Sequence, residues 1–219
     1  MSTVDWLSGP PGCFLEEDAI GYFCCDRGKG SRISLRLAVG EGVCFRYFLY
    51  IPPTEGDFQR AVEINLTGPG ARVEVYGLAL GSVGRSVLLD ISLRHSASDS
   101  HSLCQLRSID GERSDISFVG RVTVPRGALR CSSSLQNRNL RIFPSAKLRA
   151  VPILDIAAPD ARCSHGTTVG GLDKEQLFYM RSRGLGQDCA RALICDAFID
   201  EIIRHFPPDY GSAPQWIGL

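Results

Sequence analysis

The chain has 219 residues, enough for one domain of ordinary size with a sizeable core. Lys plus Arg and Asp plus Glu each number 24, so the formal net charge is zero and the basic surplus of a nucleic-acid-binding protein is missing. No stretch approaches the ~18 apolar residues of a membrane-spanning helix, and the first residues lack the pattern of a secretory signal. We therefore expect a cytoplasmic protein that binds neither nucleic acid nor a membrane.

Short segments that alternate apolar and polar residues recur up to about residue 172, in a region rich in Gly, Pro and Ser. Period-two alternation with β-branched and large apolar residues predicts strands. In chain order the clearest segments are 34–37, 71–77, 87–91, 116–119, 121–124 and 140–142. Turn elements containing proline lie between them, at 68–70, 125–127 and 144–145.

These turns share a form, in which a proline precedes a small residue and then alternation. The alanines that follow, Ala71, Ala128 and Ala146, are 57 and then 18 residues apart, and 57 is three steps of 19. A recurring unit of about that size fits one coil of a solenoid. A β-sandwich with unrelated turns also places strands at short regular intervals. The periodicity alone leaves both architectures open.

After Gly171 the pattern changes to helix. Asp173 and Gln176 form a capping-box-like start, and we expect the first helix to run through 175–181 and to end at Gly184.

A second helix is predicted from about 187 to 206, followed by Pro207-Pro208. Its apolar residues recur at three- and four-residue steps and predict one buried stripe, made of Ala190, Leu193, Ile194, Ala197, Phe198, Ile202 and Phe206.

The nine cysteines are odd in number, are irregularly spaced and include no Cys-x-x-Cys pair, so neither a zinc ribbon nor a redox dithiol is predicted. Without an export signal we expect reduced thiols, most of them packed as small apolar residues. They stand at positions 13, 24, 25, 44, 104, 131, 163, 189 and 195.

Cys163 and His165 are the first candidate metal ligands. They are two residues apart, so both side chains would face the same side of a strand. Thiolate and imidazole suit iron or zinc, but two ligands do not complete a tetrahedral site, and others would come from elsewhere, such as another chain. Taken without further information, a buried cysteine beside a surface histidine is the commoner situation.

A second cluster contains His95, Asp99, His101 and Cys104. Its spacing matches no ligand motif, and the serines around it indicate an exposed turn or strand surface.

A β-helical carbohydrate enzyme would need paired carboxylates on neighbouring coils. Asp90, Asp110, Glu112 and Asp115 are available, but three of them cluster around one predicted turn. The motifs of hydrolases, metalloproteases and phosphate-binding loops are absent from the sequence, so we expect no catalytic activity.

The segment from Cys163 to Gly184, CSHGTTVGGLDKEQLFYMRSRG, closely resembles the C-terminal signature of the SufB/SufD family. Upstream, FVGRVTV at 118–124 and QNRNL at 136–140 are similar to two further stretches of that family, in the expected order. The resemblance covers about residues 62–206.

This resemblance implies a right-handed parallel β-helix followed by a small C-terminal helical domain. The implied ranges are a β-helix core at 31–172, a helical domain at 173–206 that docks the SufC ATPase, and a tail at 207–219. Typical members of the family are about twice as long. A shortened β-helix needs a cap on its first coil, and we expect an irregular cap at 1–30 to supply it, with Trp6, Phe14, Tyr22 and Phe23.

The family implies a non-catalytic scaffold subunit of the SUF iron–sulfur cluster assembly complex, which pairs with a SufB-like subunit and docks SufC, an ABC-type ATPase. Only SufC, and not this chain, would bind ATP. The resemblance implies that His165, with Cys163 beside it, holds a transient iron–sulfur cluster or iron shared across the subunit interface. It implies docking roles for Leu177, Phe178, Tyr179 and Arg183, with internal packing as the alternative for Leu177 and Phe178.

The SufD side of the family fits better than the SufB side. Residues 145–149 contain no cysteine where SufB carries one, and Ser164-His165 stands where SufB has His-Glu. The stretch 157–161 departs from the acidic run usual in the family. The alternative is a homo-oligomeric β-helical binding module, possible as a homodimer, that has lost the cluster-assembly role.

Overall fold

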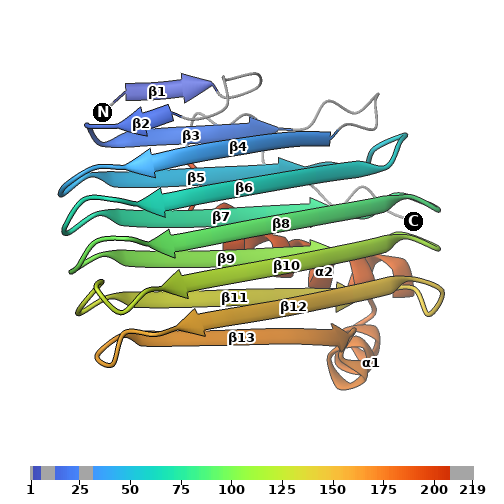
Figure 1. The fold of residues 1–219 in the computed structure, drawn as a ribbon. Helices are drawn as coiled ribbons and strands as arrows, with labels where there is room; N and C mark the ends of the chain where they lie inside the picture. The colour runs from blue at the N-terminus through green and yellow to red at the C-terminus, as the bar shows by residue number, and fades with distance from the viewer. Residues whose placement is uncertain (1, 6–12, 25–31, 208–219) are drawn as a thin grey trace.

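The computed structural model describes residues 2–5, 13–24 and 32–207. Its strands wind into a parallel β-helix, in which two sheets face each other across one core (Figure 1). The chain passes alternately from one sheet to the other, so that each coil contributes one strand to each sheet. No helix in the described part of the chain is long and apolar enough to cross a membrane.

Among the described residues, sheet A contains seven strands and sheet B six. In spatial order, sheet A consists of β1 (Ser2–Asp5), β3 (Ala19–Cys24), β5 (Cys44–Ile51), β7 (Arg72–Leu80), β9 (His101–Ile109), β11 (Ser132–Arg141) and β13 (Arg162–Gly171). Sheet B consists of β2 (Cys13–Leu15), β4 (Arg32–Val39), β6 (Phe58–Leu66), β8 (Ser86–His95), β10 (Asp115–Val124) and β12 (Lys147–Ile156).

The parallel pairing confirms the β-helix and excludes an antiparallel β-sandwich. The predicted repeat of about 19 residues is wrong, because one coil contains two strands and two turns. Ser132 lies directly beside His101, which is 31 residues earlier. Ala71 and Ala128 precede strands of sheet A, whereas Ala146 precedes a strand of sheet B, so their similar turns are not equivalent positions.

The core forms because alternate residues of every strand point inward and stack on the coil below. The two predicted segments 116–119 and 121–124 are one strand, β10, which continues through Gly120. A Cβ at Gly120 would come within 2.6 Å of both Leu135 and Phe118, so only glycine fits there between the two sheets.

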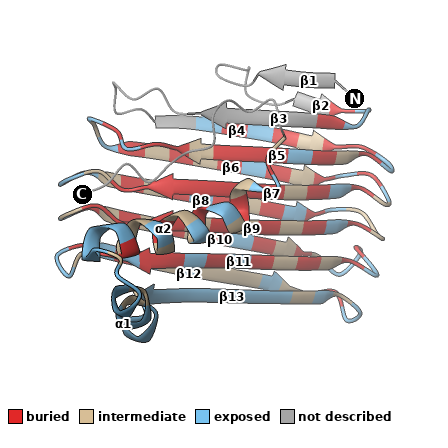
Figure 2. Cartoon of the chain, turned by 180° about the vertical axis from the view of Figure 1, so that it is seen from behind, coloured by how far each residue is buried: buried red, intermediate tan, exposed pale blue. Residues whose placement is uncertain are grey.

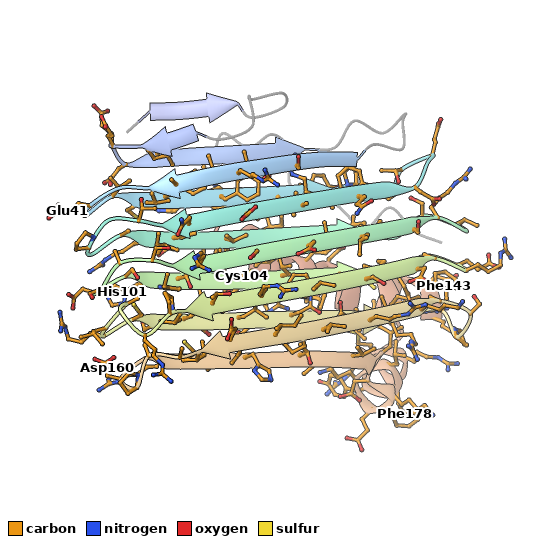
Figure 3. All side chains as sticks on the ribbon, in the orientation of Figure 1. Glu41, His101, Cys104, Phe143, Asp160 and Phe178 are labelled. Atoms are coloured by element: carbon orange, nitrogen blue, oxygen red, sulfur yellow. The ribbon has the colours of Figure 1, made fainter. Side chains whose placement is uncertain are left out.

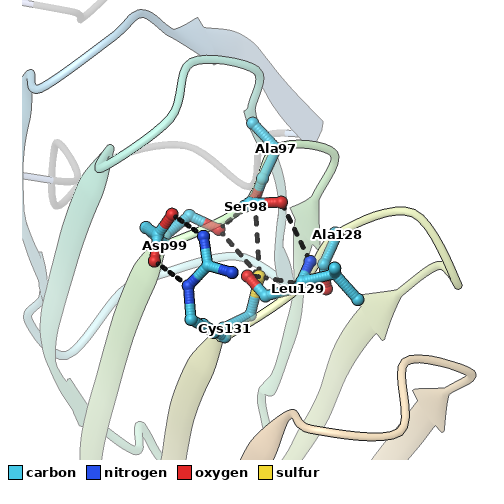
Figure 4. Close-up of polar contacts among 8 residues, drawn as sticks. Ala97, Ser98, Asp99, Ala128, Leu129 and Cys131 are labelled. Carbon is cyan, nitrogen blue, oxygen red and sulfur yellow. Dashed lines mark hydrogen bonds and ion pairs between the residues drawn. The ribbon is translucent and has the colours of Figure 1, made fainter.

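One turn position adopts the left-handed conformation in four successive coils. Glycine occupies it in the earlier coils, at Gly42 and Gly70, but Asp99 and Arg130 occupy it later, with φ of 59° and 55°. Arg130 donates two hydrogen bonds to the Asp99 carboxylate, at 2.7 and 2.6 Å (Figure 4). These bonds lower the pKa of Asp99 and join the two coils at their turns.

The two predicted helices are present as α1 (Lys174–Ser182) and α2 (Gln187–Ile203). The predicted cap is confirmed, because the Asp173 side chain accepts hydrogen bonds from the backbone N–H groups of Glu175 and Gln176. Gly184 follows α1 with φ of 90°.

Helix α2 lies across the outer face of sheet A and creates a second core there (Figure 2). Strand β7 is therefore buried on both faces along much of its length. The buried residues of this second core are Phe48, Tyr76, Leu78, Leu80, Ile109, Leu140 and Ile142 from the β-helix with Cys195, Ile199, Ile202 and Phe206 from α2 and the residues after it.

The predicted α2 stripe is partly wrong. Ala190, Ile202 and Phe206 are buried, but Leu193 is 44% exposed, and Cys195 and Ile199 take the central positions. Cys195, Ile199 and Ile202 define the side of α2 that packs against sheet A.

Polar contacts fix the rim of the second core. Glu201 pairs with both Arg107 and Arg138, the latter at 2.9 Å. The Arg107 guanidinium lies 4.7 Å from the centre of the Phe198 ring.

Most of the described part of residues 1–30 lies in strands that join both sheets, namely β1, β2 and β3. Trp6 and the side chains of Phe14, Tyr22 and Phe23 lie outside the described residues, as does the tail after Pro207. The domain boundaries, including the cap, stay a prediction.

We expect Ile199→Ala to lower the free energy of unfolding by about 2–4 kcal/mol, because it leaves a cavity in the second core. Denaturant titration measures this change, with Leu193→Ala as the matched control that should shift stability by no more than about 0.5 kcal/mol. Equal losses from both variants would show that α2 is not docked as described.

Candidate functional site

The β-helix is open at its last coil. In the described chain β13 pairs with β11 on one side, and no strand covers its other side. None of its residues is buried, and only Cys163 is half-buried, so the strand appears almost wholly exposed in Figure 2. A parallel strand in this state presents a row of unpaired backbone N–H and C=O groups.

The inward residues of the last coil form an end face with two different halves. The pairing of β13 with buried residues of β11 places Cys163, His165 and Thr167 on the inward side, beside Ser133, Leu135 and Asn137. The opposite half comes from β12, whose inward residues are mainly apolar: Leu148, Ala150, Pro152, Leu154 and Ile156. The end face is therefore polar along β13 and apolar along β12.

The structure places both candidate ligands on one side of β13, as the two-residue spacing predicts. His165 is exposed. Burial, with a smaller contribution from Cys131, raises the pKa of the Cys163 thiol. The described residues contain no group of three or more His, Cys, Asp or Glu side chains able to hold a metal ion. A metal bound to this pair would therefore need ligands from outside the described residues.

The second cluster does not converge into a metal-binding group among the described residues. His95 is fully buried, which corrects the expectation of an exposed surface, and Cys104 lies in the core, where burial raises its pKa to about 12. His101 is exposed at the edge of the β-helix, where its Nδ1 lies 2.7 Å from Ser132 Oγ (Figure 3). Asp99 is engaged by Arg130 in the turn.

A buried polar column leads from His95 toward the open end. Both His95 nitrogens lie 2.8 Å from serine oxygens, Nδ1 from Ser100 and Nε2 from Ser102. Ser102 Oγ lies 2.7 Å from Ser133 Oγ, and Ser133 is paired with Cys163 in the next coil.

A second polar column contains Ser108, Asn137 and Asn139. The Asn139 amide donates to the carbonyl of Thr168 on β13 at 3.0 Å. Neither column was predicted from the sequence, although small polar residues recur one coil apart, as at Ser102 and Ser133.

Three of the four carboxylates considered for catalysis have structural partners. Asp110 is buried and accepts a hydrogen bond from the backbone N–H of Ile142 at 2.7 Å. Glu112 pairs with Arg113 next to it, and Asp115 pairs with Arg149 on the next coil. Asp90 lies on the exposed face of sheet B.

Helix α1 presents a surface beside the open end. Phe178 is 75% and Tyr179 58% exposed, Leu177 is half-buried, and the Arg183 guanidinium lies 5.2 Å from the centre of the Tyr179 ring. Phe178 projects away from the β-helix (Figure 3), so packing against the described residues does not account for it. An open hollow of about 520 Å³ lies between α1 and the start of α2, with Phe178 and Arg181 among its lining.

A parallel β-helix with an open last coil and a helical hairpin docked on one sheet defines the structural class of this protein. Residues 55–198 match the family model described as the SUF system FeS cluster assembly, SufBD core domain. The chain belongs to this SufB/SufD family.

Several curated proteins are similar to it. A Synechocystis protein named as an iron–sulfur cluster assembly SufBD family protein is 32% identical over 164 residues, which are 68% of this chain and 36% of the relative. The iron–sulfur cluster assembly protein SufD of Escherichia coli is 31% identical over 137 residues, 63% of this chain and 32% of the relative. The chloroplastic protein ABCI7 of Arabidopsis thaliana is 37% identical over 90 residues, 41% and 19% of the two chains. The chain thus spans about a third of the length of the first two relatives.

The buried imidazole of His95 predicts a loss of stability in mild acid. Burial lowers its pKa from 6.5 to about 4, so the unfolded chain takes up a proton below pH 6.5 that the folded chain does not. The contribution of His95 is complete above pH 6.5 and falls until about pH 4, with a loss of about 2 kcal/mol between pH 7 and pH 5.

Urea titrations at several pH values measure this dependence, with His95→Gln as the comparison. The variant should lose most of the slope between pH 6.5 and 4. An unchanged slope in His95→Gln would assign the pH dependence to other groups.

Proposed function

We propose that this chain is a SufD-like, non-catalytic scaffold subunit of the iron–sulfur cluster assembly machinery of the cytoplasm. The observation that supports it best is the open last coil, which presents Cys163 and His165 inward in a chain of the SufB/SufD family. The relatives named for iron–sulfur cluster assembly support the same role.

The open end favours pairing with a second β-helix, and we propose a SufB-like subunit. A facing strand would satisfy the free backbone groups of β13. A partner that fits this end face would carry polar residues opposite β13 and apolar residues opposite β12, because the inward residues of both strands are left uncovered.

The cargo at this interface would be iron or a nascent iron–sulfur cluster, with His165 as one ligand and Cys163 beside it. Imidazole and thiolate both bind iron, and the shared inward side of β13 lets both side chains address one site. The remaining ligands would belong to the SufB-like subunit, so the cargo would be shared between two chains.

Helices α1 and α2 are proposed to dock a SufC-like ABC-type ATPase, which alone would bind ATP. The supporting observation is the exposure of Phe178 and Tyr179 on a helix with no buried residue. Leu177 and Arg183 flank these aromatic rings and would complete the contact. Helix α2 gives this surface a firm base, because Glu201 and Ile199 attach it to sheet A.

A homo-oligomeric binding module is the second candidate, supported by the same free edge. Strand β13 of one copy could pair antiparallel with β13 of another around a two-fold axis. This arrangement would also place the polar half of one end face against the polar half of the other. It would involve neither the SufB-like subunit nor the SufC-like ATPase.

Anaerobic co-expression with the SufB and SufC proteins of the same organism should yield a stable complex of all three chains. His165→Ala should leave the complex intact and lower its bound iron at least about fivefold, because a single ligand is lost. Size-exclusion chromatography with light scattering gives the composition, and iron analysis with absorbance spectra gives the cluster. Ser164→Ala, on the outward side of β13, is the matched control. A monomer or homodimer that ignores both partners would favour the binding module.

Replacing Phe178 and Tyr179 by serine should weaken binding of the SufC-like ATPase at least about tenfold, since exposed aromatic anchors commonly dominate such contacts. Binding of the SufB-like subunit should stay the same. Isothermal titration against each partner measures both, and Val83→Ser, an equally exposed apolar residue in a distant turn, is the control. Undiminished ATPase binding by the double variant would remove α1 from the docking surface.

A further inference from the structure

Strands β12 and β13 are the last strands of sheets B and A in the described chain, and each pairs with one neighbouring strand there. Along a strand the backbone N–H groups point alternately to its two edges, so every second residue serves the free edge. The residues that bond to the preceding coil therefore identify those whose N–H groups point away from it.

Strand β13 has a complete row of donors on its free edge. The N–H of Arg162 donates to the Cys131 carbonyl at 2.8 Å, so the even-numbered residues of β13 direct their N–H groups toward β11. The Thr168 carbonyl, which accepts a hydrogen bond from Asn139 on β11, agrees with this assignment. The odd-numbered residues in 163–171 then serve the free edge, and none of them is proline.

Strand β12 has a gap in the middle of the corresponding row. The N–H groups of Lys147 and Ala157, at its two ends, each donate to a carbonyl of the preceding coil at 2.8 Å, and the register with β10 has no break between them. The even-numbered residues of β12 therefore serve the free edge. The central one is Pro152, which has no N–H to offer. Proline occurs in strands essentially only where its missing donor faces an unpaired edge.

The missing donor lies in the apolar half of the end face. Ala150, Leu154 and Ile156 pack against the main core, but each is only half-buried. A partner can still cover this apolar area with its own side chains. It cannot form an unbroken ladder of backbone hydrogen bonds across Pro152.

We propose that Pro152 confines strand addition at the open end to sheet A. A second β-helix adds one strand along β13 and meets β12 through apolar side chains. The same asymmetry orients the partner, because a strand placed against β12 would meet a proline in place of a donor. The inference rests on the proposed function where it names the SufB-like subunit as partner. The role of Pro152 itself applies equally to a strand from a second copy of this chain.

The variant Pro152→Val tests this role on the chain alone. It gains an N–H on the free edge of β12 and loses no bond to β10, so β12 should accept a strand from a second copy. We expect the dissociation constant for self-association to fall at least about tenfold, because each new backbone hydrogen bond adds to the contact. Analytical ultracentrifugation over a concentration series measures it. Ala150→Val, which enlarges an apolar side chain of the same strand and keeps Pro152, is the control and should change the constant less than about threefold. Unchanged self-association of a Pro152→Val variant that melts like the wild type overturns the proposal.

A pair of proline substitutions tests the same point in the complex with the SufB-like subunit. Thr167→Pro removes a free-edge N–H from β13 and should weaken binding at least about tenfold, whereas Ala150→Pro removes one from β12 and should weaken it less than about threefold. Thr167→Val and Ala150→Val keep both N–H groups and control for the altered side chains. Isothermal titration measures all four variants. Equal effects of the two proline variants, large or small, would overturn the proposal. If the SufB-like subunit does not bind at all, the proposed function fails, and self-association of Pro152→Val still decides the role of Pro152.

Discussion

Parallel backbone pairing between successive coils organises this molecule, because each strand needs the coil beside it to satisfy its N–H and C=O groups. Pairing stacks the inward residues into columns, such as the one that joins Ser102 to Ser133 and reaches Cys163. The same requirement is unmet at β13, where the described β-helix has no following coil. The open end and the candidate site are thus two consequences of one constraint.

The second core gives sheet A a covered outer face within an otherwise repeating β-helix. Tyr76 and Leu78 point outward from β7, where an isolated β-helix would carry polar residues, and α2 covers them. Helix α2 in turn holds α1 beside the end face, so the exposed Phe178 and the inward His165 occupy one end of the protein. This placement connects a proposed docking surface with a proposed ligand site through a short stretch of chain.

Features fixed by local interactions could be predicted from the sequence. The start of α1 depends on Asp173 and two nearby amides, and the shared side of Cys163 and His165 depends only on strand geometry.

The coil length could not be predicted, because the turns before Ala128 and Ala146 look alike although they lead into different sheets. His95 looked exposed among serines, yet its serine partners make burial acceptable. Leu193 looked buried because the sequence does not reveal which side of α2 meets the sheet.

The most direct test of the central claim, that the open last coil is the assembly face, is a cryo-EM structure of the anaerobic complex with the SufB-like and SufC-like proteins. We predict density for a partner strand along the free edge of β13, with Cys163 and His165 enclosed between the two chains and the ATPase seated on α1. A complex in which β13 remains open to solvent, with the SufB-like subunit bound to another face, would contradict the account.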